Sequence, residues 1–157
     1  MGTLLRAATF VCAALLVSQG PAHASGNFLC QADDEALKFN AESTFSHGLG
    51  GTFVGFGAEL AVRLKKAPAD FAVVKFDAAQ LVHHWFTDGA LNLHLYRERA
   101  AEAPHGYVEL IIETIQEPDD ETAFSGTYKL IVHDVPASEG AEGMTLDAEG
   151  KISCSVG

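Results

Sequence analysis

Apolar and polar residues alternate one by one along most of this chain, and this pattern constrains its fold more than any other feature. In the segment 54–64, for example, Val54, Phe56, Leu60 and Val62 alternate with small or charged residues. A period of two residues is that of a β-strand with one apolar face, whereas a helix repeats its apolar positions every three to four residues. No segment shows a convincing helical period. The alternation recurs in residues 37–45, 54–64, 108–113, 128–133 and 144–156.

Short turn-forming clusters separate these runs and join them into one domain. Glycine, proline and acidic residues, which favour turns, concentrate between the alternating segments. None of the clusters is long enough for an interdomain linker, and residues 25–157 are of a typical size for one domain. We therefore predict a single all-β domain of about eight antiparallel strands, with a closed barrel favoured over a β-sandwich. The clusters are residues 48–51, 65–68, 117–121 and 136–143.

The first 24 residues have the organisation of a cleaved secretory signal. Arg6 precedes an apolar run from Ala7 to Val17, and a Gly-Pro break leads to Ala-His-Ala at residues 22–24. A charged start, a short apolar stretch and an Ala-x-Ala site are typical of signal peptides. The run is too short to cross the roughly 30 Å of hydrocarbon in a bilayer. We expect a soluble protein, periplasmic or secreted, that is not inserted into a membrane.

The charge of the exported part argues against some partners. Removal of Arg6 with the signal leaves nine Lys and Arg residues against 21 Asp and Glu, a formal net charge of −12. Nucleic acids and anionic membrane surfaces attract proteins mainly through clustered Lys and Arg. We therefore expect no nucleic-acid partner, and we interpret the acidity as an aid to solubility. The sequence identifies no protein partner.

Two cysteines remain after the signal, Cys30 and Cys154, close to the two ends of the exported chain. Disulfides persist in exported proteins, and no Cys-x-x-Cys spacing indicates a metal-binding or redox pair. We predict a structural disulfide between these two residues. Such a bridge closes a loop of roughly 120 residues, which is worth about 4 to 5 kcal/mol in the chain-entropy model.

The stretch HHWFTDGALNLHLY, residues 83–96, places three histidines around an Asp-Gly step. Asp-Gly between alternating apolar residues is a strong signal for a two-residue β-hairpin turn. With this turn, His83 lies opposite His94 on one face. His84 lies on the apolar face, where we expect a hydrogen-bonded core residue. Directly opposed Cβ atoms are about 5 Å apart, so His83 and His94 could share a metal ion.

A metal site at this hairpin needs more ligands than the hairpin supplies. Closed zinc sites use three or four protein ligands, and His83 and His94 are the two in plain view. His105, His133 or acidic side chains would have to complete the set. The alternative is a hairpin whose half-exposed face is rich in histidine without a metal, and this interpretation has more support.

No motif for catalysis or cofactor binding stands out. The glycines in 48–51 lack the third glycine and the following helix of a dinucleotide-binding loop, and the acidic run 119–121 lacks EF-hand spacing. There is no H-E-x-x-H, G-x-S-x-G or P-loop motif, and no pair of carboxylates suggests acid–base catalysis. We predict a non-enzymatic protein with no catalytic residue and no cofactor.

The stretch LKFNAESTFSHGLGGTFVGFGAELAV, residues 37–62, resembles the opening of the YceI-like family. In that family a strand of the form xFxxxH-G leads through a glycine turn into G-x-F-x-x-F-x-G-x-L. The later segments FAVVKFDAAQL, VELIIETIQ and FSGTYKLIVHDV are also similar, so the likeness extends over about residues 37–135. Ala58 stands where the family prefers glycine. The matching positions are Phe39, His47, Gly48, Gly51, Phe53, Phe56 and Leu60.

The resemblance implies a lipocalin-like periplasmic barrel that encloses a polyisoprenoid chain. An eight-stranded barrel has room for one small ligand, and an apolar pocket suits a lipid tail. Three classes of function stay open: a carrier of an apolar small molecule such as a lipid or isoprenoid, an envelope or interaction protein with a filled β-sandwich core, and a metal-binding protein that uses His83 and His94. In the carrier, the ligand would contact Phe56, Leu60, Phe86, Leu91, Leu93, Leu110 and Leu130.

Overall fold

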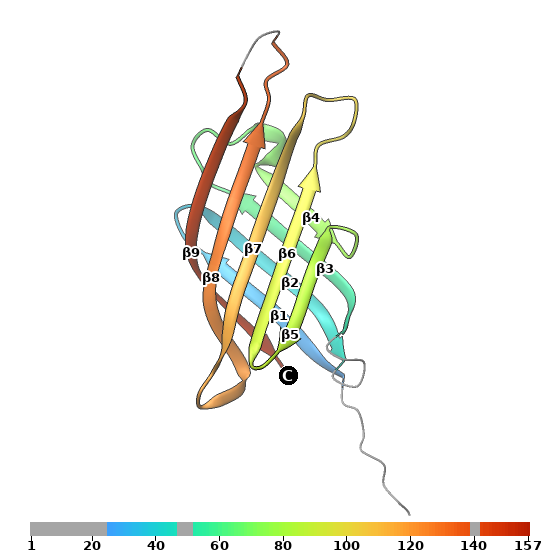
Figure 1. Ribbon diagram of the computed structural model, residues 1–157, viewed down its shortest axis with the longest axis vertical. Helices are drawn as coiled ribbons and strands as arrows, with labels where there is room; N and C mark the ends of the chain where they lie inside the picture. Colours follow the sequence, from blue (N-terminus) through green and yellow to red (C-terminus); the bar gives the residue numbers. More distant parts are fainter. Residues whose placement is uncertain (1–24, 47–51, 139–141) are drawn as a thin grey trace, which may run out of the picture.

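A computed structural model of the chain describes residues 25–46, 52–138 and 142–157, and these residues form one antiparallel β-sheet (Figure 1). The predicted signal at 1–24 and the glycine turn at 47–51 lie outside the described residues. The elements are β1 (Ser25–Asp33), β2 (Leu37–Ser46), β3 (Thr52–Val62), the short 3₁₀ helix η2 (Ala69–Phe71), β4 (Val73–Asp77), β5 (Leu81–Thr87), β6 (Ala90–Glu98), β7 (Gly106–Glu117), β8 (Asp120–Asp134) and β9 (Met144–Val156).

The sheet curls into a nearly closed barrel. Its strands are hydrogen-bonded in the order β4-β3-β2-β1-β9-β8-β7-β6-β5. Strands β5 to β9 form one side, and β1 to β4 cross behind them at an angle (Figure 1). The predicted all-β barrel is confirmed, with nine strands where about eight were expected. The two strands at the ends of this order, β4 and β5, do not pair with each other within the described residues.

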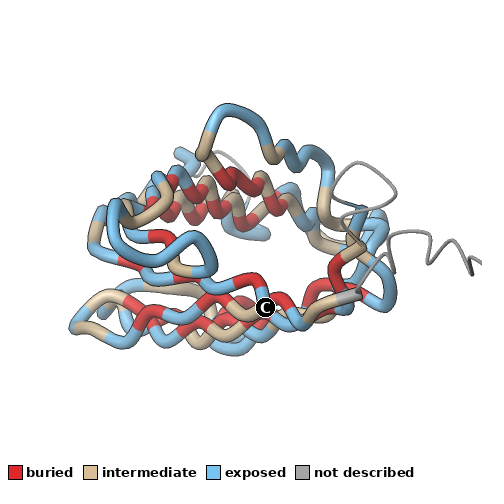
Figure 2. Tube along the Cα trace, turned by 90° about the horizontal axis from the view of Figure 1, so that it is seen from below, coloured by how far each residue is buried: buried red, intermediate tan, exposed pale blue. Residues whose placement is uncertain are grey.

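The alternating residues place an apolar core inside this barrel. Strand β2, for example, buries Leu37, Phe39 and Phe45 and leaves Lys38, Glu42 and Thr44 exposed. Buried residues occur along both halves of the sheet, on either side of the interior (Figure 2). Small polar residues are rare in the core, and those buried within the described part of the chain are Ser43, Asn92 and Thr114.

The disulfide between Cys30 and Cys154 joins β1 to β9, which connect the two halves of the barrel. These strands pair between Phe28–Gln31 and Ser153–Val156, and the two cysteines lie opposite each other in this short register, which backbone hydrogen bonds between Asn27 and Gly157 extend by one pair. Both cysteines are buried. The predicted bridge is confirmed, and it reinforces a junction that has few paired residues.

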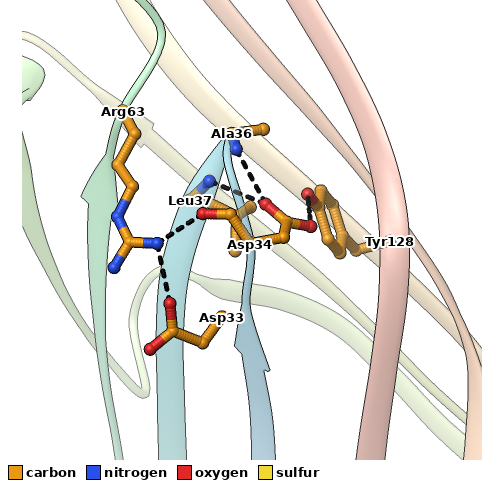
Figure 3. A network of polar contacts seen from close by, with 6 residues as sticks. All are labelled: Asp33, Asp34, Ala36, Leu37, Arg63 and Tyr128. Atoms are coloured by element: carbon orange, nitrogen blue, oxygen red, sulfur yellow. Dashed lines mark hydrogen bonds and ion pairs between the residues drawn. The ribbon is translucent and has the colours of Figure 1, made fainter.

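Beyond this junction a polar network holds the β1–β2 turn against β8 (Figure 3). The Tyr128 hydroxyl donates to Asp34 Oδ2 at 2.5 Å. The backbone N–H groups of Ala36 and Leu37 donate to Asp34 Oδ1 at 2.8 and 3.0 Å. Gly150 of β9 lies beside this contact, where a β-carbon would overlap the carboxylate and the tyrosine ring. The network therefore needs glycine at position 150.

The same network sets the ionisation of Asp34. Partial burial raises the pKa of this carboxyl, but the Tyr128 hydroxyl, the two backbone donors and the nearby Arg63 guanidinium together hold the pKa below its usual value of 3.8. Arg63 also donates to Asp33 Oδ1 at 2.7 Å and to the Asp34 carbonyl (Figure 3). Burial and the bond to Asp34 raise the pKa of Tyr128. The pair is therefore a neutral phenol donating to an ionised carboxylate at neutral pH.

We expect Tyr128→Phe to lower the free energy of unfolding by about 1 to 2 kcal/mol at neutral pH, because a hydrogen bond to a charged acceptor is lost. A carboxylate with a depressed folded pKa contributes stability that is present above its unfolded pKa and is lost as pH falls through the folded value. The deficit of the variant should therefore shrink below about pH 4. Urea denaturation of both proteins at neutral pH and below pH 4 measures this difference in the free energy of unfolding.

Tyr96→Phe is the matched control for this prediction. The Tyr96 hydroxyl also donates to a carboxylate, Glu98 Oε1 at 2.8 Å, but this contact is exposed. Its removal should change the free energy of unfolding by less than about 0.5 kcal/mol. A Tyr128→Phe deficit that is as small as the control's, or that stays constant into acid, would contradict the role assigned to Asp34.

Candidate ligand-binding site

The Asp-Gly hairpin forms as predicted. Asp88 and Gly89 have φ angles of 52° and 74°, the left-handed conformation that a two-residue type I′ turn requires at both positions. His83 lies opposite His94 in the predicted register. Farther from the turn, a β-bulge shifts the register between Leu81 and His83.

His83 and His94 stack on the outer face of the barrel, with ring centroids 6.4 Å apart. His94 Nε2 lies 2.6 Å from Oε1 of Glu109 on β7. The sequence did not reveal Glu109, because the register of β7 against β6 depends on the irregular connection 99–105 between them. Within the described residues, no group of three or more His, Cys, Asp or Glu is arranged to hold a metal ion.

His105 and His133, the further histidines considered for a metal, pack around Tyr107. Their rings lie 5.9 and 5.2 Å from the Tyr107 ring and 5.7 Å from each other. His133 Nδ1 also lies 2.9 Å from the Thr145 hydroxyl. Both side chains are thus occupied by contacts among neighbouring strands and loops.

His84 is exposed, so the expectation of a buried core histidine was wrong. Its side chain lies on the inner-facing side of β5, as the alternation predicted, and its ring contacts Phe53 of β3 at a centroid distance of 5.0 Å. However, β5 ends the sheet order and has a strand partner on one side only. A residue on an edge strand can therefore belong to the inner face and still reach solvent.

The seven residues predicted to contact a ligand belong to the apolar core of the barrel. The five leucines are at most 1% exposed, Phe56 is 5% exposed, and Phe86 is partly buried against the core. Exposure this low means that not even a water molecule touches the leucines, so side chains fill the interior in this structure. A ligand would enter only if the sheet widened. The leucines are Leu60, Leu91, Leu93, Leu110 and Leu130.

Six phenylalanines from five strands form an aromatic cluster near the strand ends drawn at the bottom of Figure 1. Ring centroids of neighbouring members are 4.5 to 6.5 Å apart, a range in which aromatic pairs attract one another. Two of the six, Phe56 and Phe86, are among the residues that the sequence predicted to contact a ligand. The others join them because strands far apart in sequence converge here. The aromatic cluster is Phe28, Phe45, Phe53, Phe56, Phe86 and Phe124.

Strands β3 and β5 come together beside this cluster through aromatic rings. The Phe53 ring of β3 lies 5.0 Å from the His84 ring of β5, and the Phe45 ring of β2 lies 5.4 Å from the Phe86 ring of β5. Within the described residues, β5 pairs with β6 and ends the sheet order. Side chains from β2, β3 and β5 thus meet at this end of the barrel.

The other end of the barrel is fastened by Arg99. Its guanidinium donates to both carboxylate oxygens of Asp70 at 2.6 and 3.2 Å and lies 2.8 Å from Asp134 Oδ1. It also lies 4.8 Å from the ring centre of Phe71, which is 4% exposed. The hydrogen bond from Arg99 lowers the pKa of Asp70, and Asp70 and Asp134 raise the pKa of Arg99. The ion pairs therefore persist over a wide pH range.

Comparison with protein-family models, with curated proteins and with solved structures finds no match for this chain. Among the described residues, no helix is long and apolar enough to cross a membrane. The function must therefore be inferred from the interior of the barrel and its openings.

Proposed function

We propose that this chain is an exported, non-enzymatic protein that binds an apolar molecule, a lipid or an isoprenoid, inside its β-barrel. The observation that carries the proposal is the apolar character of the interior. The few small polar residues buried with it are hydrogen-bonded within the protein. A polar ligand would lose its hydration there without new partners. An apolar chain would gain about 25 cal/mol for each Å² that it buries.

Two features of the chain support export. Residues 1–24 have the pattern of a cleaved signal. The buried Cys30–Cys154 disulfide is the kind of bond that persists outside the reducing cytosol. The resemblance of residues 37–135 to the YceI-like family favours an isoprenoid among apolar ligands.

The interior is filled, so binding requires the barrel to expand. Leucine side chains can change rotamer, but the space for a ligand must come from separation of strands. Strands β4 and β5 end the sheet order and do not pair with each other within the described residues, so separation of these two strands breaks no strand pairing. The ligand would then displace members of the aromatic cluster and lie against Leu91, Leu93 and Leu110.

The filled core also favours a second function, that of an envelope or interaction protein without a small ligand. The near-zero exposure of the inward leucines is the observation in its favour. In that case the apolar interior serves stability alone, and binding would use the outer surface. One measurement separates these two functions.

The experiment is native mass spectrometry of the protein purified from its export compartment without denaturant. We expect an additional mass of several hundred daltons that is lost on extraction with organic solvent and regained on incubation with the extract. The disulfide-bonded chain alone, two hydrogens below the reduced mass and unable to take up the extract, would overturn the proposal and favour the interaction protein. An adduct of tens of daltons that a chelator removes would instead indicate a metal at His83 and His94.

A further inference from the structure

We propose that the edge of β4 on the side away from β3, where it faces the end of β6, binds an extended acidic segment of a partner protein as an additional β-strand. In strand addition of this kind, main-chain hydrogen bonds provide affinity and alternate side chains provide specificity. The inference goes beyond the proposed function, because this edge is available whether or not the barrel holds a ligand. We refer to residues 73–77, which form it, as the docking edge.

The first argument is the direction of the backbone groups of β4. Residues of an antiparallel pair alternate between pointing their N–H and C=O groups at the partner strand and away from it. The Val62 N–H donates to the Ala72 carbonyl at 2.9 Å, so the even-numbered residues of β4 are turned to β3. Val73 and Lys75 therefore direct their backbone groups to the docking edge, with which no strand of the described residues pairs.

The second argument is that a side chain covers the middle of this edge. Exposed strand edges are normally protected, because they would otherwise pair with other chains. Here the Arg97 guanidinium donates to the Lys75 carbonyl at 2.5 Å, and the Asp77 N–H donates to Gln80 Oε1 at 2.9 Å. Arg97 and Lys75 are both exposed. A peptide N–H can therefore replace the guanidinium at the Lys75 carbonyl, because the released arginine returns to water.

The third argument is that β5 leaves a strand position vacant. Strand β5 begins at Leu81, opposite Leu95 of β6. Strand β6 continues to Arg97 and Glu98, which pair with β7 and with no other strand in the described part of the chain. The docking edge lies across from these two residues. An added strand would therefore lie between β4 and the end of β6, beyond the start of β5.

The space between these strands is an open groove. Its larger part, of about 490 Å³, is lined by residues 75–77 of β4 and residues 96–98 of β6. A smaller part, of about 180 Å³, continues along Val73 towards Arg99. Glu98 lines both parts and already accepts a hydrogen bond from the hydroxyl of Tyr96, on its own strand. The groove therefore has room beside the docking edge for an extended chain.

The charges at the middle of the groove indicate an acidic peptide. Among the described residues, Arg97 has no carboxylate within ion-pair distance. The Lys75 ammonium lies 3.9 Å from Glu59, and both side chains are mostly exposed. A peptide residue opposite Lys75 would share its outer face, so a glutamate there would form a cross-strand ion pair. Its two neighbours would turn to the inner face, where Val74 and Phe76 favour apolar side chains.

A second copy of this chain is a less suitable occupant. If two docking edges paired antiparallel about residue 75, Lys75 would lie opposite the same residue of the other copy. Like charges in directly opposed positions destabilise a strand pair. A lysine on an edge strand is a common protection against such self-association. The same lysine attracts an acidic strand, so the docking edge discriminates between the two occupants.

The test is an NMR titration of ¹⁵N-labelled residues 25–157, with the disulfide intact, with the peptide acetyl-Ser-Val-Glu-Val-Ser-amide. We expect saturable shifts of the amide signals of Val73, Lys75 and Glu98. A peptide with lysine in place of glutamate should bind about fivefold more weakly, because repulsion replaces attraction at Lys75. A peptide N-methylated at the glutamate cannot donate to the Lys75 carbonyl and should not bind.

A charge reversal in the protein tests the position of the peptide. In Lys75→Glu, the preference should reverse, so that the lysine peptide binds about fivefold more tightly than the glutamate peptide. Lys151→Glu is the matched control, because it makes the same change of net charge at an exposed lysine of β9, opposite Thr127. It should keep the wild-type preference. Both lysines are exposed, so both variants should melt near the wild-type temperature.

Other outcomes overturn the proposal. Absence of saturable shifts at the docking edge, or equal binding of the N-methylated peptide, would show that no strand is added there. An unchanged preference in Lys75→Glu would show that the glutamate does not lie opposite residue 75. Signals of the docking edge that broaden as the concentration of the protein alone rises would identify a second copy as the occupant. None of these results affects the mass measurement that tests the carrier function.

Discussion

Leu93→Asp is expected to leave the chain unfolded at room temperature. Leu93 is 0% exposed and lies between His84 of β5 and Ile112 of β7, at the centre of the front half of the sheet. Loss of a buried leucine side chain costs about 2 to 5 kcal/mol. Burial of an unpaired carboxylate, or of its protonated form, adds several kcal/mol. The sum reaches the roughly 5 to 15 kcal/mol that stabilise a typical domain.

Ile115→Asp is the matched control, because it makes a similar chemical change at a side chain that is 71% exposed. We expect it to fold with a free energy of unfolding within about 1 kcal/mol of wild type. Far-UV circular dichroism and urea denaturation of both variants make the comparison. Similar stability of the two would mean that residue 93 does not face the core and that the hairpin register is wrong.

Removal of the disulfide is the second change with a large expected effect. Cys30→Ala/Cys154→Ala should lower the free energy of unfolding by about 4 to 5 kcal/mol, since the bridge closes a very long loop and restricts the unfolded chain. The two cysteines are 124 positions apart. In a domain of this size, such a loss lowers the melting temperature by about 10 °C or more.

Reductant provides the control for this prediction. Addition of dithiothreitol should lower the melting temperature of wild type towards that of the double variant and leave the variant unchanged. The four-residue register between β1 and β9 gives the loss a structural consequence as well, because amides at this junction should exchange faster with solvent. A wild-type melting temperature that reductant does not shift would show that the bridge contributes little.

A filled barrel has a consequence for how a ligand could be carried. The protein would not need a preformed cavity, since the core can close over itself when the ligand leaves. In such a carrier, replacing inward leucines such as Leu110 changes affinity and stability together.

Several parts of this architecture could be predicted from the sequence because their causes are local. Alternation of residue types determines which side chains share a face, and burial in β2 and β7 follows it closely. Asp88-Gly89 specifies a tight turn, and the turn specifies that His83 lies opposite His94. The pairing of Cys30 with Cys154 follows from there being two cysteines in residues 25–157.

The tertiary structure alone decided how the sheet closes. Nothing local in β4 or β5 indicates that these strands end the order, because strand pairing depends on the twist and length of every strand between them. The exposure of His84, its contact with Phe53 and the carboxylate at His94 all follow from that arrangement. Thus, side-chain periodicity determined the inside and the outside of the barrel, whereas contacts between segments distant in sequence decided how its sheet closes.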